Sequence, residues 1–347
     1  MTITELKQLR LYNHHLTAPV PKLTAACDLL GVQSQFTVNA YHALRTRSSE
    51  VLSDETWGEG LCKNWTIRGT IHVFALDDLG LFRYREDLYR NSDFTRFTFR
   101  EGGWCGTPER QKFWSEKILS YVENGIRERE ALKAACIADG ITDAELECMF
   151  ESWGGGMRDL CERGFLVYAA KEKKEFLPAP EFMPMGQVAA EREMVRRYFT
   201  HCAPATLRDA AYFFGWTQTK LKGYLKELPV ESVVCEGKTY YYIGALPTAC
   251  PDVPRCILLA GFDQLMLGYE KKDSIFVPTE FVRGIFNLQG IVLAPVLLDG
   301  TVAGKWKCKD GKLNVECFRV FSQEEKNAAT EEAERWYGKL KKAEFLS

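Results

Sequence analysis

Apolar side chains recur at helical spacing along much of the chain, and the pattern is clearest between residues 190 and 244. It predicts three helices in this region, over residues 190–202, 206–214 and 217–228. Thr206 is a candidate N-cap for the second helix, and Gly215 ends it. Residues 230–243 then alternate around a Glu-Gly-Lys turn, which predicts a β-hairpin. Elements in this order indicate a winged helix-turn-helix module, a fold that serves DNA binding and protein docking alike.

A similar order of elements recurs twice upstream. The middle copy has predicted helices over 109–123, 128–138 and 142–163, the last interrupted by glycines 154–156, and a second wing over 165–177 that includes Lys171–Glu175. The N-terminal copy has predicted helices at about 3–15, 22–30, 37–47 and 50–58, followed by paired strands within 63–74. A loose period of about 70–80 residues indicates tandem modules of one kind.

The pattern changes after residue 250. Residues 291–318 form a predicted strand meander with Asp-Gly turns at 299–300 and 310–311, and a final helix is expected over 322–343. We therefore predict an α+β fold: tandem winged helix-turn-helix modules with a C-terminal β-rich, barrel-like region and a terminal helix. The expected domains are winged-helix modules over 1–100, 101–188 and 189–246 and a β-rich scaffold over 247–347.

Composition narrows the class of protein. Of 347 residues, 46% are hydrophobic and 27% are charged, which is ordinary globular composition. No apolar run approaches the roughly 18 residues of a membrane-spanning helix, and the charged N-terminus does not read as a secretory signal. We expect a cytoplasmic, nucleoid-associated monomer with no membrane partner. The net charge of −2, from 45 Lys+Arg and 47 Asp+Glu, excludes a histone-like basic protein.

Cysteine and histidine spacing does not suggest a metal centre. The twelve Cys contain no CxxC pair, and the closest two are Cys250 and Cys256. We interpret them as reduced core thiols, with metal or disulfide roles as the alternative. The five His contain no HExxH or HxxxH pair. We therefore predict no metal and no cofactor.

The segment 33–35, Gln-Ser-Gln, follows a predicted helix that Gly31 ends. In an extended stretch residues i and i+2 face the same side, whereas in a helix they point about 200° apart. With Val32, Ser34 and Phe36 turned toward the core, both amides project into one pocket. The alternative is that two glutamines beside a helix end are caps or solvated side chains.

Two further segments carry candidate chemistry. Arg68 and His72 lie in a strand-like stretch with even spacing, so they share a face, and Gly69 between them suggests a bulge. One interpretation is that the two residues contact a phosphate and orient a reacting group. The equally good alternative is that they are structural, as a salt bridge and a histidine whose hydrogen bonds are made within the protein. Asp263 is a lone carboxylate in the apolar part of 257–273. It is either a turn or capping group, or a site residue with a polar partner.

These segments together carry a family resemblance. The stretches are LLGVQSQ at 29–35 with ALR at 43–45, TIRGTIH at 66–72, LLAGFDQLMLGY at 258–269 and VLLDGTVAGKW at 296–306. In this order, over about residues 20–320, they resemble the winged-helix DNA glycosylases of the AlkZ/YcaQ-like family. The resemblance implies tandem winged helices around a β-rich scaffold and removal of N-alkylated purines, with crosslink unhooking in one branch. The branch signatures are Gln-aliphatic-Gln and Gln-x-Asp, so Gln33 and Gln35 match the catalytic pair of the Gln-x-Gln branch, and Ser34 departs from it.

The implied chemistry suits a pair of amides. A purine alkylated at N7 or N3 is already positively charged and leaves without protonation, unlike the leaving group of an ordinary glycosidase. An amide oxygen can accept from the attacking water, and an amide NH2 can donate to sugar or phosphate. A neutral amide is no general base at pH 7. We therefore expect a monofunctional DNA glycosylase that acts on cationic lesions in double-stranded DNA and not on normal bases.

Basic residues cluster despite the overall balance. Residues 192–226 contain seven Lys/Arg and two acids, net +5, and residues 305–312 contain four Lys and one Asp, net +3. A third group comprises Arg83, Arg85, Arg90, Arg96 and Arg100, against three acids. Such clusters on DNA-binding modules favour phosphate contact, although each alone is more often a solvated face. The predicted DNA- and substrate-binding residues are Arg45, Arg68, His72, Asp263, Lys271, Lys305 and Lys307.

Two other classes of function remain open from the residues alone. A non-catalytic winged-helix regulator or architectural protein would bind DNA without producing an abasic site. A winged-helix scaffold for protein interaction would bind DNA weakly.

Overall fold

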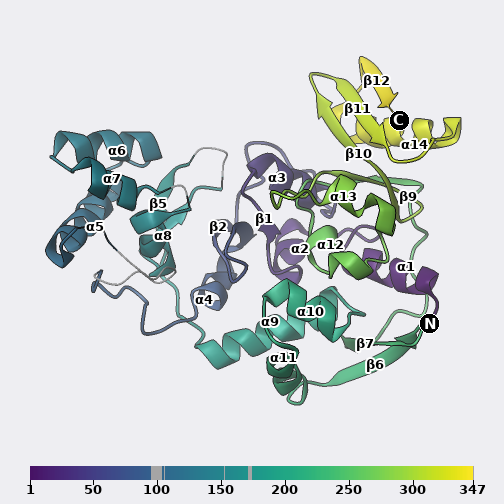
Figure 1. Ribbon diagram of the computed structural model, residues 1–347, viewed down its shortest axis with the longest axis horizontal. Coiled ribbons are helices and arrows are strands. Elements are labelled where there is room, and N and C mark those ends of the chain that lie inside the picture. The colour runs from purple at the N-terminus through teal and green to yellow at the C-terminus, as the bar shows by residue number, and fades with distance from the viewer. Residues whose placement is uncertain (95–103, 105, 152, 171–173, 347) are drawn as a thin grey trace. The chain divides into compact units, whose positions relative to one another are not determined.

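The computed structural model describes residues 1–94, 104, 106–151, 153–170 and 174–346, and the chain forms two compact units (Figure 1). Unit 1 comprises Met1–Trp57 and Arg192–Ser347, and unit 2 comprises Gly58–Glu191. The fold is mixed α+β, as expected. The division into four domains drawn from the sequence stays a prediction.

Unit 1 begins with a group of short elements. They are α1 (Ile3–Asn13), α2 (Lys22–Asp28), β1 (Val32–Gln33) and α3 (Thr37–Arg45), which confirm the first three predicted helices. The helix predicted at 50–58 is wrong, because residues 50–53 have no helical structure and residues 54–58 form turns. The Ser53 hydroxyl accepts from the Thr56 amide at 3.2 Å, and such side-chain bonds compete with helical backbone pairing.

The predicted helices and hairpin of 190–244 are confirmed. The elements are α9 (Gln187–His201), α10 (Leu207–Phe214), α11 (Gln218–Leu225), β6 (Val230–Cys235) and β7 (Lys238–Ile243). Thr206 caps α10 by accepting from the Asp209 amide, and Gly215 ends it with a φ of 66°. Strands β6 and β7 pair antiparallel around Glu236-Gly237. The winged-helix identity of this module stays an interpretation.

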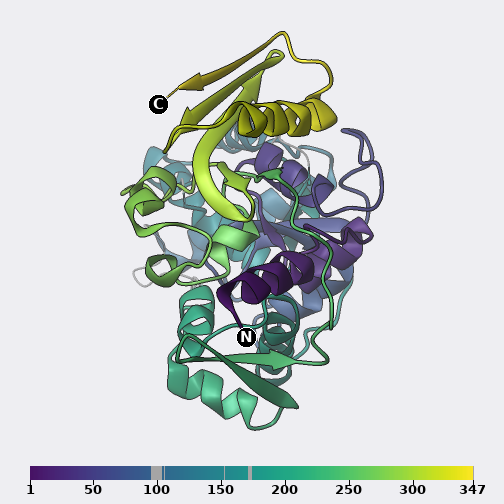
Figure 2. The same cartoon turned by 90° about the vertical axis from the view of Figure 1, so that its right-hand side faces the viewer.

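The C-terminal part of unit 1 is a five-stranded sheet in the order β12-β11-β10-β9-β8. The strands are β8 (Cys256–Leu258), β9 (Pro295–Leu298), β10 (Thr301–Lys309), β11 (Lys312–Cys317) and β12 (Lys342–Leu346). Helix α14 (Gln323–Tyr337) covers one face of the sheet (Figure 2). Its Ala329 and Ala333 belong to one buried apolar cluster with Leu313 and Val315. The short elements between β8 and β9 are α12 (Gln264–Leu267), η2 (Lys271–Asp273), η3 (Thr279–Phe281) and α13 (Val282–Ile285).

Two expectations for this region are wrong. The region expected to be barrel-like is an open sheet in the described chain, with β8 and β12 at its edges. The helix expected over 322–343 ends at Tyr337, because Gly338 takes a φ of 72° and turns the chain. Residues 342–346 then form a strand parallel to β11, a long-range pairing that the local pattern does not encode.

Unit 2 contains four strands in the order β3-β2-β4-β5, namely β2 (Leu61–Trp65), β3 (Ile71–Ala75), β4 (Leu166–Tyr168) and β5 (Phe176–Pro178). Its helices are η1 (Leu76–Asp78), α4 (Leu79–Phe82), α5 (Pro108–Glu123), α6 (Arg129–Ala138), α7 (Asp143–Met149) and α8 (Gly155–Glu162). Trp114, Leu132, Met157 and Phe176 lie in one core. The predicted helices, the glycine break and the β4–β5 hairpin are confirmed, and residues 171–173 of the predicted wing lie outside the described residues. Among the described helices of both units, none has the length and apolar character needed to cross a membrane.

Candidate functional site

The segment 33–35 is held between two helices of unit 1. Leu30 and Gly31, with φ of 56° and 82°, turn the chain out of α2. The Gly31 amide donates to the Ala26 oxygen at 2.8 Å and thereby satisfies a carbonyl at the helix end. The chain then passes through β1 and enters α3 at Thr37. Both ends of the segment are thus fixed by secondary structure.

The two glutamines differ in exposure. Gln33 is only 7% exposed, whereas Gln35 is exposed. Val32 and Ser34 are buried as expected. The Ser34 hydroxyl has no hydrogen-bond partner among the described residues, so an aliphatic side chain would suit this position. The expectation that Phe36 also turns into the core is wrong, because Phe36 is 49% exposed. The catalytic role of the two amides stays a prediction.

Phe36 instead lines a cavity of about 450 Å³, which we call the Phe36 groove. Its ring stacks against Phe262 at a centroid distance of 6.0 Å. Trp306 also lines the groove, and its indole donates to the Leu259 oxygen at 2.8 Å. The groove residues are Phe36, Asn39, Gly261, Phe262, Ile291–Ala294, Lys305–Lys307, Asn314–Glu316 and Leu346. Sequence reasoning missed this cavity, whose walls come from six separate stretches of chain.

The two predicted lysines of β10 both line the Phe36 groove. Lys305 forms an ion pair with Glu316 on the neighbouring strand at 2.9 Å. Lys307 is exposed and lies opposite Asn314. The residue paired with Lys307 on the neighbouring strand is neutral, whereas Lys305 already has an acidic partner. The charge of Lys307 is therefore more available to a phosphate than that of Lys305.

Asp263 is completely buried and forms a bidentate ion pair with Arg47. The Arg47 guanidinium donates to the two carboxylate oxygens at 2.7 and 3.0 Å, and the Leu265 amide donates to one of them at 2.9 Å, so Asp263 also caps α12. This matches the capping alternative, and a direct contact with substrate stays a prediction. Sequence reasoning missed Arg47, which is 216 residues away. The only signal was that a buried carboxylate needs a cation.

Arg68 and His72 belong to unit 2, but not to one strand face. Arg68 lies in the turn between β2 and β3, where Gly69 has a φ of 69°, so the expected strand bulge is a hairpin turn. His72 lies in β3, is 1% exposed, and has Nδ1 3.1 Å from the Thr70 oxygen. Burial, helped by the Arg68 charge, lowers the pKa of His72 to about 3. His72 is therefore neutral at pH 7, and its Nε2 has no hydrogen-bond partner in the described chain.

The two remaining predicted residues belong to unit 1. Arg45 ends α3, contacts His42 Nδ1 at 2.8 Å and lies 4.5 Å from the centre of the Tyr337 ring. This arrangement connects α3 to the end of α14. Lys271 starts η2 and is partly exposed. Neither residue lines the Phe36 groove.

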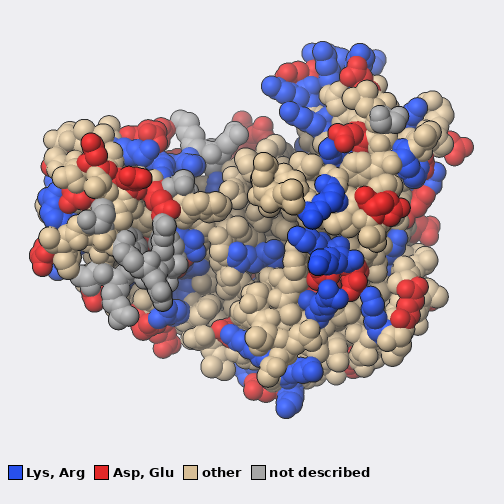
Figure 3. Space-filling view, in the orientation of Figure 1, with Lys and Arg blue, Asp and Glu red and all other residues tan. Residues whose placement is uncertain are grey.

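Many basic residues already have acidic partners. Arg196 and Arg197 both pair with Glu193, Arg85 pairs with Asp87, and Arg90 pairs with Glu181. Arg96 and Arg100 lie outside the described residues. Lys and Arg nevertheless gather at the outer end of the C-terminal sheet and around α11 in Figure 3. Lys222 on α11 and Lys226, which directly follows α11, are exposed.

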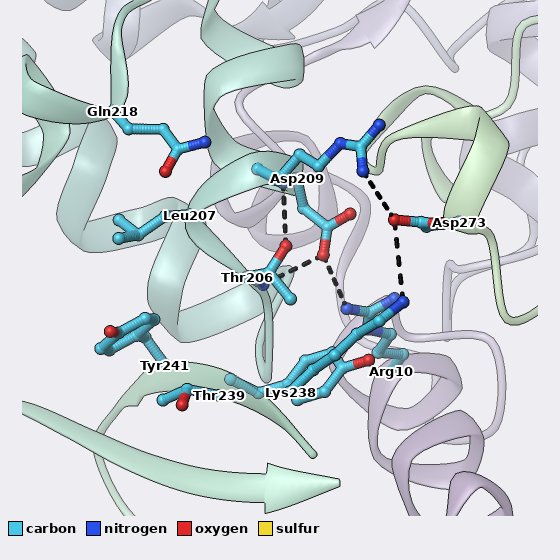
Figure 4. Close-up of a pocket in the computed structure, with 11 residues that line it drawn as sticks. Arg10, Thr206, Leu207, Asp209, Gln218, Lys238, Thr239, Tyr241 and Asp273 are labelled. Atoms are coloured by element: carbon cyan, nitrogen blue, oxygen red, sulfur yellow. Dashed lines mark hydrogen bonds and ion pairs between the residues drawn. The ribbon is translucent and has the colours of Figure 1, made fainter. Parts of the chain in front are cut away.

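A second hollow of about 350 Å³ lies beside α10 and the β6–β7 hairpin (Figure 4). Arg208 and Lys238 both reach Asp273, at 3.0 and 3.7 Å. Arg10 forms a buried ion pair with Asp209 at 3.1 Å. The cations that line this hollow are therefore matched by carboxylates, which makes it a weaker phosphate site than the exposed lysines of α11.

All three comparisons with known proteins find DNA glycosylases. A family model described as DNA glycosylase AlkZ-like matches residues 27–338. An interstrand DNA cross-link repair glycosylase of Streptomyces sahachiroi is 24% identical over 311 residues, which are 84% of this chain and 83% of the relative. The solved structure of Streptomyces sahachiroi DNA glycosylase AlkZ matches with a TM-score of 0.77 at 20% identity and covers 100% of both chains.

Proposed function

Because the chain belongs to the AlkZ-like DNA glycosylase family, we propose that it is a monofunctional glycosylase that removes cationic N7- or N3-alkylated purines from double-stranded DNA. The observation that carries this proposal is the pair of neutral amides, Gln33 and Gln35, on a segment fixed at both ends by helices. No cofactor enters the proposed reaction.

The two amides have separate roles in this proposal. Gln33 is nearly buried, so its side chain is restricted, and it orients the attacking water through its carbonyl oxygen. Gln35 is exposed and donates from its NH2 to the sugar or a phosphate, which stabilises the positive charge that develops at C1′. The leaving base becomes neutral as the bond breaks, so no side chain has to protonate it. The products are the free alkylpurine, an abasic site and one proton, which the attacking water releases to solvent.

The remaining candidate residues hold DNA or position the site. Lys307, Lys305 and Lys271 contact phosphates. Arg68 contacts a phosphate, and neutral His72 accepts a hydrogen bond through Nε2. Asp263 acts through Arg47, which also donates to the His14 and Ala43 oxygens and so connects α12 to the end of α1 and to α3, the helix that follows the Gln-x-Gln segment. Arg45 has a similar positioning role through His42.

Interstrand crosslinks are a second candidate substrate. The relative from Streptomyces sahachiroi is named for crosslink repair. A crosslink attached through purine N7 leaves the same positive charge on the base, so the same hydrolysis would detach it from one strand. Incubation with an N7-crosslinked duplex, followed by denaturing electrophoresis, measures this activity directly.

The experiment that tests the catalytic pair is a single-turnover assay on a duplex with one N7-methylguanine. We expect Gln33→Ala and Gln35→Ala each to lower the rate of abasic-site formation by about 100-fold, since each loses a group that acts in the transition state. Gln323→Ala is the matched control, because Gln323 is an exposed glutamine at the start of α14 and lines neither cavity described above. Equal rates for wild type and all three variants would refute the assignment of the pair.

A further inference from the structure

Three metal-ligating side chains that no step of the proposed reaction uses converge in unit 1. They are His15, Asp28 and His201, and their ligand atoms all lie within 4.8 Å of one another. His15 Nε2 is 2.8 Å from one Asp28 oxygen, and His201 Nε2 is 3.3 Å from the other. The spacing of these residues in the sequence gave no sign of the cluster.

The spacing of these atoms suits a small divalent cation. With Zn²⁺–N and Zn²⁺–O bonds of about 2.0–2.1 Å, neighbouring ligand atoms of a tetrahedral site are about 3.3 Å apart. The separation between His201 Nε2 and its Asp28 oxygen matches this value, whereas the His15 Nε2 separation of 2.8 Å, to the other Asp28 oxygen, is that of a hydrogen bond. Three protein ligands leave a fourth position for water, and the side chains are 11%, 16% and 23% exposed, so ion and water have access.

The surrounding backbone also favours a cation. Asp28 is the last residue of α2, His201 is the last residue of α9, and His15 directly follows the C-cap of α1. The carboxyl ends of helices carry partial negative charge, so three of them converge on the ligand atoms. The nearby Arg196 and Arg197 oppose this effect, but both form ion pairs with Glu193 at 2.7 and 2.8 Å.

The backbone at His15 gives an independent reason to look for a function. Its φ of 59° lies in the left-handed region, where a helix end commonly uses glycine. The Leu16 amide donates to the Leu11 oxygen at 3.0 Å, so His15 occupies the usual glycine position of this motif. A histidine in this backbone conformation is less favourable in free energy than a glycine, and here it directs its imidazole at Asp28.

We propose that His15, Asp28 and His201 bind one Zn²⁺ ion, or a similar divalent transition metal, that fastens the ends of α1, α2 and α9 to one another. Asp28 lies five residues before Gln33, so the ion stabilises the helix end from which the Gln-x-Gln segment departs. The role is structural, and the chemistry of base excision does not pass through it.

The test uses the full-length protein after dialysis against a chelator. Calorimetric titration should give one Zn²⁺ per chain with a Kd of about 1 µM or tighter, and Zn²⁺ should raise the Tm. Asp28→Asn and His201→Gln should each weaken binding about 100-fold and abolish the rise in Tm. Asp252→Asn, which removes one exposed carboxylate elsewhere, should leave both unchanged.

A spectroscopic measurement separates this site from cysteine ligation. Co²⁺ bound by two imidazoles and a carboxylate should give visible d–d absorption without a thiolate charge-transfer band. His201 is partly exposed at a helix end, so His201→Gln is expected to fold even if Asp28→Asn does not. Absence of saturable binding, or binding that both ligand variants retain, would overturn the proposal.

Discussion

At the scale of single residues, the proposed active pair is unsymmetrical. Gln33 is almost buried, while Gln35 is exposed two positions later. A restricted amide suits the orientation of water, and an exposed one can reach a bound sugar or phosphate. Since neither amide titrates, the pair itself does not make the reaction rate fall at either low or high pH.

This lack of titration leads to a prediction for pH dependence. The wild-type rate on N7-methylguanine should stay level from about pH 5 to 8, because the pKa of His72, about 3, keeps that imidazole neutral throughout. Gln35→Asp reproduces the Gln-x-Asp form of the other branch, so it should keep activity within about 10-fold at pH 7. Its rate should fall as the pH approaches about 4, where the new carboxylate becomes protonated. Single-turnover rates across this range are the measurement, and a wild-type rate that rises tenfold per pH unit would show that a titrating base acts instead.

A second residue-scale prediction concerns Asp263. Asp263→Asn leaves the buried Arg47 charge uncompensated and should lower the free energy of unfolding by about 3–5 kcal/mol. Asp299→Asn is the matched control, because its ion pair with Arg255 is about half exposed and is worth at most about 1 kcal/mol. Urea unfolding compares the two variants with wild type. An unchanged midpoint for Asp263→Asn would contradict the structural role and favour direct contact with substrate.

At the scale of elements, the helix pair α10–α11 and the β6–β7 hairpin offer an outward-facing basic helix. Lys222 and Lys226 are exposed on or next to α11, whereas Arg208 and Lys238 are matched by Asp273. Phosphate contact should therefore depend more on the α11 lysines than on the hollow beside them.

Charge reversal on α11 tests this assignment. Lys222→Glu and Lys226→Glu should each weaken binding to undamaged duplex about 10-fold at low salt, and each should reduce the slope of log affinity against log salt by about 1. Lys112→Glu, at an exposed lysine of α5 near Glu116, is the control and should change affinity less. Fluorescence anisotropy at several salt concentrations gives both quantities. A salt slope that the α11 variants leave unchanged would mean that DNA lies elsewhere.

Elements set by local chemistry could be predicted from the sequence, whereas those set by distant partners could not. The Thr206 cap, the Gly215 stop and the β6–β7 turn are encoded within a few residues and were predicted. Strand β12 depends on pairing with β11, and the Asp263–Arg47 pair joins residues 216 positions apart. In the candidate site, the Gln-x-Gln segment was found from its motif. The Phe36 groove and the His15–Asp28–His201 cluster could not be predicted, because their residues come from separate stretches of chain that only the fold brings together.

At the scale of the whole molecule, the net charge of −2 hides an uneven distribution. Several arginines of the basic clusters are neutralised by neighbouring carboxylates, and the exposed lysines of α11 and β10 remain as local positive surface. Such a molecule is expected to bind DNA moderately and with strong salt dependence. Under the proposed function, selectivity then depends on the lesion, since a base that already carries positive charge leaves without an acid.

The most direct test of this account is the release of free base from two duplexes that differ at one position. One duplex carries N7-methylguanine, and the other carries guanine. We predict that the wild-type protein releases N7-methylguanine and forms abasic sites in equal amounts, with no detectable release of guanine. Salt-sensitive binding of both duplexes without base release, or release of guanine at a comparable rate, would contradict the account.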